Sequence, residues 1–318
     1  MDDDLLGAGF ETRTLPLGGG GIGGDAVATL VRHRAKDPRL GAILYVHGFS
    51  DYFFQRHVAE HFAALGFDFY ALDLRAYGRS LRPDQAPNFV TDLRDHFEEL
   101  DAAARVIRAE HGHERLTVLG HSTGGLVTAL WAHERRADDV LDALVLNSPW
   151  LDLAEPWVMR TIGTAVVRGL GRVSPGFVVR AGLGEVYGQS LHSDHQGEWV
   201  FDPKWKPLNG FPVRAGWLRA VRRGHAQVQR GLDIRVPVLV LHSARSLLHG
   251  KRWTAEAMTA DTVLDVEQIA RWAPSLGHDV TVVAVDGGMH DLFLSAEPVR
   301  ERALAEVDSW LAERLPSH

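Results

Sequence analysis

The chain contains no cysteine among its 318 residues, which excludes disulfide bonds and catalytic or metal-binding thiolates. It also lacks an apolar run long enough to span a bilayer. Its first residues, Met-Asp-Asp-Asp, are acidic and no apolar segment of the signal-peptide kind follows them. The formal net charge is −7, so there is no basic excess to attract nucleic acid. We therefore expect a soluble, cytoplasmic protein that does not bind nucleic acid.

Short β-rich segments alternate with helical patterns along most of the chain. Such alternation is typical of an α/β fold with a mostly parallel central sheet flanked by helices. The hydrophobic spacing also predicts helices over 89–110 and 297–313. The predicted strands are 26–34, 41–47, 67–74, 116–120, 143–148, 236–243 and 280–286.

Segment 152–235 breaks this alternation, because it contains no convincing buried strand. It is rich in tryptophan, glycine, proline and arginine, and has helical fragments such as 156–170. A connection of this length should have a structure of its own. We interpret it as a mainly helical cap inserted between two strands. The predicted domains are then a core of 1–151 and 236–318 and a cap of 152–235.

Ser122 lies in a Gly-x-Ser-x-Gly motif, between a predicted strand and a helical segment. A sharp strand-to-helix turn needs small residues on both sides, here Gly120 and Gly124. Such a turn exposes the serine hydroxyl above the sheet, with the N-terminus of the next helix beneath it. With 32 glycines in the chain the motif alone is weak evidence, but its position favours a nucleophile.

Three further motifs accompany the serine turn: His47-Gly48-Phe49 after a strand, the segment 73–80 (Asp-Leu-Arg-Ala-Tyr-Gly-Arg-Ser), and Gly287-Gly-Met-His290 after the last strand. With these four motifs in order, nearly the whole chain resembles the α/β-hydrolase superfamily. The similarity is greatest to the branch of monoacylglycerol lipases, lysophospholipases and serine aminopeptidase-type hydrolases. The resemblance implies a serine hydrolase with an insertion lid, in which segment 73–80 is structural.

The resemblance implies a triad in the order serine, acid, histidine, with His290 as the base for Ser122. No carboxylate directly follows the strand where the acid usually lies, and the chain has an apparent insertion there. Asp261 begins Asp-Thr-Val-Leu-Asp, which resembles the lipase pattern whose first aspartate is the acid. Asp261 is therefore the first choice. Asp265 and Asp152 remain alternatives, although acidic residues are also common at helix starts.

By the same resemblance, the oxyanion hole consists of the N–H groups of Phe49 and Thr123. The expected reaction is hydrolysis of a carboxylic ester through an acyl-enzyme, without metal or cofactor. Aromatic and aliphatic residues in the cap predict a small-molecule substrate with an apolar acyl chain, such as a monoacylglycerol or lysophospholipid. An acyltransferase, a peptidase or thioesterase, and a non-catalytic ligand-binding protein of the same fold remain open. The sequence gives no indication of an oligomeric state.

Three other patterns carry less weight. The Gly-x-Gly-x-x-Gly motif at 18–23 has strand-like sequence on both sides, unlike a dinucleotide site, and is read as a flexible connection. His57 and His61 have the spacing of a zinc motif, but no third ligand is evident and rim histidines are the favoured interpretation. The pair His192 and His195 is weaker still.

A basic stretch of the cap predicts an amphipathic helix that covers the active site with its apolar face. Transient contact with a membrane surface is the alternative function of this helix. Its residues are Arg219, Arg222, Arg223 and Arg230, with Trp217, Leu218 and Val221 nearby.

Overall fold

An eight-stranded sheet forms the centre of the protein in the computed structural model, which describes residues 6–18, 26–153, 164–250 and 252–315. The strand order is β1-β2-β4-β3-β5-β6-β9-β10. β2 is antiparallel to β1 and to β4, and all other neighbours are parallel. The strands are β1 (Phe10–Pro16), β2 (Val27–His33), β3 (Gly41–Val46), β4 (Phe67–Asp73), β5 (Leu116–His121), β6 (Ala143–Asn147), β9 (Val238–Ser243) and β10 (Val280–Val285).

The mostly parallel sheet confirms the predicted fold class, and the seven predicted strands are present with shifts of a few residues at their ends. β1 is an additional strand at the sheet edge that the sequence did not predict. Its side chains are mostly exposed, with Leu15 as its buried residue. It therefore lacks the apolar pattern from which strands are recognised.

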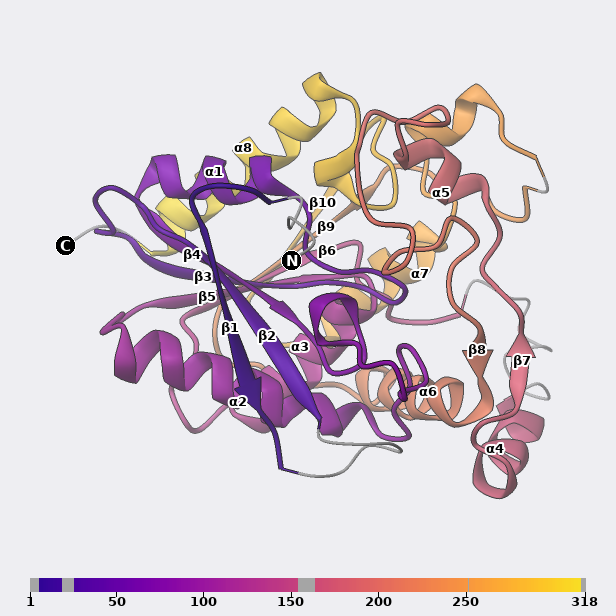
Figure 1. Ribbon diagram of the computed structural model, residues 1–318. Coiled ribbons are helices and arrows are strands. Elements are labelled where there is room, and N and C mark those ends of the chain that lie inside the picture. Colours follow the sequence, from indigo (N-terminus) through magenta and orange to yellow (C-terminus); the bar gives the residue numbers. More distant parts are fainter. Residues whose placement is uncertain (1–5, 19–25, 154–163, 251, 316–318) are drawn as a thin grey trace.

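Helices cover both faces of the sheet (Figure 1). α1 and α8 pack against one face through residues such as Phe62 and Leu311. α2 and α3 pack against the other through residues such as Leu100 and Trp131. The helices are α1 (Arg56–Leu65), α2 (Phe97–Arg105), α3 (Thr123–Glu134), α4 (Thr164–Val173), α5 (Val186–Leu191), α6 (Ala215–Gln229), α7 (Val266–Trp272) and α8 (Glu297–Arg314).

The predicted helix over 89–110 is three consecutive helical segments that start later, at Leu93. A 3-10 turn (Leu93–His96) leads into α2, and a π-helical turn (Val106–Glu110) ends it. Leu93, Leu100 and Ile107 are buried as the apolar stripe predicts. α8 ends at Arg314 and buries Leu304 and Val307, as expected for the last helix.

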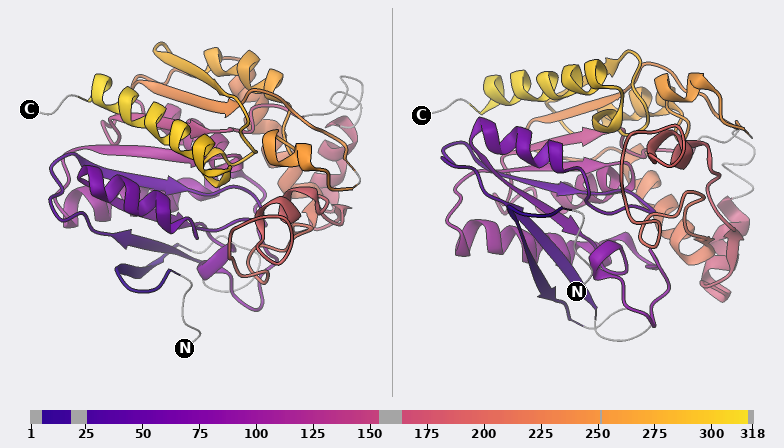
Figure 2. Two further views of the ribbon diagram at one scale, coloured as in Figure 1. Left: turned by 90° about the horizontal axis from the view of Figure 1, so that it is seen from above. Right: turned by 45° about the horizontal axis from the view of Figure 1, so that its top comes forward.

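The long connection between β6 and β9 contains α4, α5, α6 and a pair of short antiparallel strands, β7 (Val178–Arg180) and β8 (Val213–Arg214). Figures 1 and 2 place α4, α5, β7 and β8 beyond the carboxyl ends of the parallel strands, whereas α6 packs against α3. Part of the predicted helical fragment 156–170 lies outside the described residues, as does most of the glycine motif at 18–23. The division into core and cap at residues 152 and 235 stays a prediction.

Among the described residues, no helix combines the length and apolar character needed to cross a bilayer. The cytoplasmic location stays a prediction from the sequence.

Candidate active site

Ser122 lies at the turn where β5 ends and α3 begins. Its backbone has φ 53° and ψ −117°, a strained conformation for a residue with a side chain. The turn depends on close backbone approaches on both sides. A Cβ added to Gly120 would collide with the Thr128 hydroxyl, and one added to Gly124 would collide with the His47 carbonyl oxygen. These glycines therefore allow β5, α3 and the loop that contains His47 to pack closely around Ser122.

Three predicted site residues from distant parts of the chain meet at this turn. The Oγ atom of Ser122 lies 3.0 Å from Nε2 of His290, and Nδ1 of His290 lies 2.8 Å from Oδ2 of Asp261. Exposure of these residues is only 8%, 3% and 0% for the serine, histidine and aspartate. A carboxylate only accepts hydrogen bonds, so Nδ1 carries the proton and Nε2 can accept the hydroxyl proton. The arrangement can activate a serine for nucleophilic attack.

Asp261 reaches this position because the chain returns to the end of β9 after the apparent insertion. Its backbone pairs with Ser246, just beyond β9. The N–H of Leu247 donates to the Asp261 carbonyl at 2.8 Å, and the Asp261 N–H donates to the Arg245 carbonyl at 3.0 Å. The backbone pairing therefore places Asp261 directly beyond β9 in space, although it follows the insertion in the sequence.

The carboxylate of Asp261 is oriented by its own loop. Its Oδ1 atom accepts the N–H groups of Val263 and Leu264 at 2.8 and 2.7 Å, which leaves Oδ2 to face the imidazole. Asp265 instead caps α7 by accepting the Glu267 N–H. Asp152 pairs with Arg222 at 2.8 Å. Of the three predicted acids, the structure thus brings Asp261 to His290.

The turn formed by His47, Gly48 and Phe49 lies directly against Ser122. A Cβ added to Gly48 would lie 3.0 Å from the Cβ of Ser122. Nε2 of His47 accepts the Leu74 N–H at 3.1 Å, so its Nδ1 donates to the Gly48 carbonyl at 2.8 Å. Burial lowers the pKa of His47, which favours this neutral form.

Thr123, the other predicted oxyanion residue, is the first residue of α3. Its N–H belongs to the helix N-terminus, where amides lack carbonyl partners within the helix. The turn and the start of α3 therefore both lie next to Ser122, as the predicted oxyanion hole requires.

Asp291 is a buried carboxylate next to His290 that no sequence motif indicated. Its Oδ1 atom accepts the Asn147 amide at 2.7 Å and the Phe293 N–H at 3.1 Å. Its Oδ2 atom accepts the Gln55 amide at 3.2 Å. These bonds connect the loop that carries His290 to the end of β6. The sequence signal that could have found it is an aspartate before the short apolar turn Leu292–Leu294, because aspartate is a preferred residue at the start of a helix.

Two aromatic rings contact the imidazole of His290. The His121 ring centroid lies 4.9 Å away, and the Tyr187 ring from α5 packs edge-on at 5.4 Å. Burial lowers the pKa of His121, and its Nδ1 atom lies 3.1 Å from the Asn147 carbonyl. As predicted from the sequence, His121 makes a local hydrogen bond while His290 faces the serine.

The two histidines of the zinc-like motif have separate protein partners. Nε2 of His57 lies 2.8 Å from the Phe293 carbonyl oxygen, and its ring stacks on Trp199. Nε2 of His61 lies 3.0 Å from the carboxylate of Asp308. In the cap, His192 lies near the Phe201 carbonyl. Within the described part of the chain, no group of three or more histidine, aspartate or glutamate side chains could hold a metal ion.

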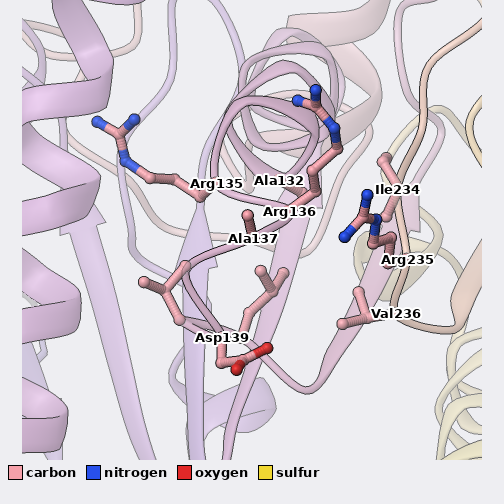
Figure 3. Close-up of a pocket in the computed structure, with 10 residues that line it drawn as sticks. Ala132, Arg135, Arg136, Ala137, Asp139, Ile234, Arg235 and Val236 are labelled. Atoms are coloured by element: carbon pink, nitrogen blue, oxygen red, sulfur yellow. The ribbon is translucent and has the colours of Figure 1, made fainter.

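A cavity of about 380 Å³ lies at the amino ends of the parallel strands, between the end of α3 and the start of β9 (Figure 3). Its arginines have acidic partners nearby, since Arg135 pairs with Asp101 and Arg136 pairs with Asp233. It is lined at the amino ends of β6 and β9, whereas Ser122 follows the carboxyl end of β5. This cavity is therefore separate from the candidate active site.

Comparison with known proteins matches residues 37–297 to the family described as serine aminopeptidase, S33. The chain is 27% identical over 301 residues to a monoacylglycerol lipase of Mycolicibacterium smegmatis, covering 93% of this chain and 96% of the relative. It is 24% identical to a phospholipase of Bacillus subtilis, covering 83% of this chain and 92% of the relative. The crystal structure of a monoacylglycerol lipase from Paleococcus ferrophilus has the same fold, with a TM-score of 0.68, 22% identity, and coverage of 90% of this chain and 99% of that one. The chain therefore belongs to the serine aminopeptidase S33 family of α/β hydrolases, and it is a hydrolase.

Proposed function

We propose that the protein hydrolyses carboxylic esters that carry one apolar acyl chain, through an acyl-enzyme on Ser122. The observation that carries this proposal is the continuous hydrogen-bonded arrangement of Ser122, His290 and Asp261, at 3.0 and 2.8 Å. A non-catalytic binding protein of this fold would not need to keep all three side chains in contact.

In the proposed mechanism, His290 removes the proton of Ser122 as the hydroxyl attacks the ester carbonyl carbon. Asp261 keeps the imidazole in the required tautomer and stabilises its charged form. The N–H groups of Phe49 and Thr123 donate to the oxyanion of the tetrahedral intermediate. His290 then protonates the leaving alcohol. Water, activated by the same imidazole, releases the acid and restores the serine.

An aromatic group beside the nucleophile supports an apolar acyl chain. The ring of Phe49 lies 4.1 Å from that of Trp217, and the ring of Trp150 lies 5.8 Å from Trp217. The backbone of Trp150 donates to the Ser122 carbonyl at 3.0 Å, so this group lies next to the serine. Such rings favour a hydrocarbon chain over a charged peptide. The relatives named monoacylglycerol lipase and phospholipase support a lipid-like ester.

The test compares native protein with Ser122→Ala on monoacylglycerols and p-nitrophenyl esters of increasing chain length. We expect turnover by the native protein, with an optimum at a medium or long chain, and none by the variant. Lysophospholipids and aminoacyl p-nitroanilides test the phospholipase and aminopeptidase alternatives. Adding an alcohol tests acyl transfer, which would give a new ester. Equal turnover by both proteins, or greater activity on the anilides, would overturn the proposal.

We further propose that the connection between β6 and β9 acts as a cap and contacts membrane surfaces transiently. The basic stretch of α6 does not support the membrane contact that its sequence suggested, because its apolar residues Trp217 and Val221 are buried. The exposed apolar side chains near α4 and β7 support it instead, with Val173 87% and Phe177 52% exposed. Phe177→Glu should therefore reduce co-sedimentation with lipid vesicles. Unchanged co-sedimentation would speak against this contact.

A further inference from the structure

Three consecutive residues after the oxyanion turn bind one segment of the connection between β6 and β9. Ser50 Oγ accepts the N–H of Phe211 at 2.9 Å. The hydroxyl of Tyr52 accepts the N–H of Asp202 at 2.8 Å. Between them, Asp51 Oδ1 lies 2.7 Å from the Lys206 ammonium. Segment 202–211 therefore attaches to the chain immediately beyond Phe49.

The flanking parts of this loop are held by the core. On one side, His47 is fixed by hydrogen bonds to Leu74 and Gly48. On the other, the N–H of Phe53 donates to Asp73 Oδ1 at 2.9 Å. Among the described hydrogen bonds, those of His47 and Phe53 fix the two ends of the loop. Ser50 and Asp51, which follow Phe49, are bound to segment 202–211 instead.

The ion pair of Asp51 and Lys206 is buried, with exposures of 2% and 7%. Burial raises the pKa of Asp51, but the charge and hydrogen bond of Lys206 act together with the nearby His121 and His47 to lower it, and the net pKa is lowered. The ammonium also lies 5.7 to 5.8 Å from the ring centres of Phe54, Tyr187 and Phe201. In such an environment, removal of one charge leaves the other buried without a counter-ion.

The backbone between Phe49 and Asp51 is itself strained. Ser50 has φ 55°, in the left-handed region that residues with side chains rarely adopt. A strained conformation persists only where the surrounding contacts fix it. The contacts of Ser50 and Asp51 with segment 202–211 are of this kind.

We propose that Lys206 is a positioning residue, whose ion pair with Asp51 holds the N–H of Phe49 in the oxyanion hole. The hole is then complete only while segment 202–211 is seated on the core. This inference rests on the proposed function, because it gives the Phe49 amide its role in ester hydrolysis.

The test uses Lys206→Met, with the exposed neighbour Lys204→Met as the matched control. Removing one oxyanion donor typically costs about 100- to 1000-fold in kcat, so mispositioning it should cost about 10- to 100-fold. We expect this loss in kcat for Lys206→Met, with KM changed less than about threefold, and partial rescue in Lys206→Arg. Lys204→Met should retain native kinetics. A native kcat in Lys206→Met would overturn the proposal.

The double variant Asp51→Asn/Lys206→Met separates positioning from the cost of a stranded charge. If the pair positions the loop, the double variant regains thermal stability but keeps the low kcat. If the ion pair is merely structural, stability and kcat recover together, and the proposal is wrong. If Lys206→Met alone does not fold, the kcat of this double variant tests the proposal instead.

Hydrogen exchange of the backbone amides gives a measurement that does not depend on catalysis. In whichever of Lys206→Met and the double variant folds, we expect faster exchange over residues 49–52 and unchanged exchange in β5 and α3. If native protein hydrolyses no ester, the proposed function fails, and exchange alone tests the coupling. Unchanged exchange over 49–52 would then overturn it.

Discussion

The Oδ2 atom of Asp261 lies 2.8 Å from Nδ1 of His290, while its other oxygen accepts two backbone N–H groups. The loop of Asp261 thus fixes the direction of the carboxylate, and the carboxylate fixes the imidazole. Because the aspartate has no exposed surface, its bonds are not shared with bulk water. The orientation of His290 toward Ser122 depends on this relationship.

Asp261→Asn should therefore abolish most of the activity. The amide can donate to Nδ1 and favour the wrong imidazole tautomer, an effect of about 10⁴-fold in kcat in serine hydrolases with this arrangement. Steady-state kinetics on a p-nitrophenyl ester measure the loss. Asp265→Ala is the control, because it removes a helix cap worth about 1 kcal/mol while kcat stays within a few-fold of native. The reverse pattern would identify Asp265 as the acid.

Gly124→Ala should destabilise the serine turn by several kcal/mol, on the order of the larger effects known for single substitutions. The added methyl group would meet the carbonyl oxygens of Val46 and His47. Gly169→Ala in α4 is the matched control, because nothing lies within 4 Å of its added Cβ. It should be neutral or stabilising by about 0.5–1 kcal/mol. Denaturant unfolding measures both, and a native-like Gly124→Ala would refute the steric account.

Asp291→Ala should lower both stability and kcat. It leaves the Asn147 amide and the Phe293 N–H without their buried acceptor, at a cost of about 1–3 kcal/mol for each unsatisfied group. The loop of His290 then loses the bond from Asn147 to Asp291 and keeps the longer bond from the Leu292 N–H to Asn147 Oδ1, at 3.3 Å, so kcat should fall while KM changes little. Thermal melting and steady-state kinetics test this together. Native kcat in a destabilised variant would mean that Asp291 supports the fold alone.

His225 should make the protein sensitive to acid. Burial and the nearby Arg222 lower its pKa from 6.5 to about 3. Between these values the unfolded chain binds a proton that the folded chain does not, so stability falls as the pH drops below 6.5. His225→Gln should reduce the slope of unfolding free energy against pH by about 1.4 kcal/mol per unit in that range. Equal slopes for native protein and variant would contradict this assignment.

Much of the fold can be predicted because buried parallel strands are almost continuously apolar, as in β3 and β5. β1 could not be predicted because only one of its seven residues is buried, so it lacks the apolar pattern of a strand. Ser122 and His290 are predictable from local motifs at strand ends. The resemblance to the lipase pattern favours Asp261, but spacing alone cannot show that its backbone pairs with Ser246 at the end of β9. Lys206 gives no local signal, because its partner Asp51 is 155 residues away.

The most direct test of the central claim is the mass of the protein quenched during turnover of a p-nitrophenyl ester. We predict a burst of p-nitrophenol and a mass increase of one acyl group, mapped by proteolysis to the peptide that contains Ser122. The Ser122→Ala variant should give neither. Acylation of another residue, or full turnover by the variant, would contradict the account.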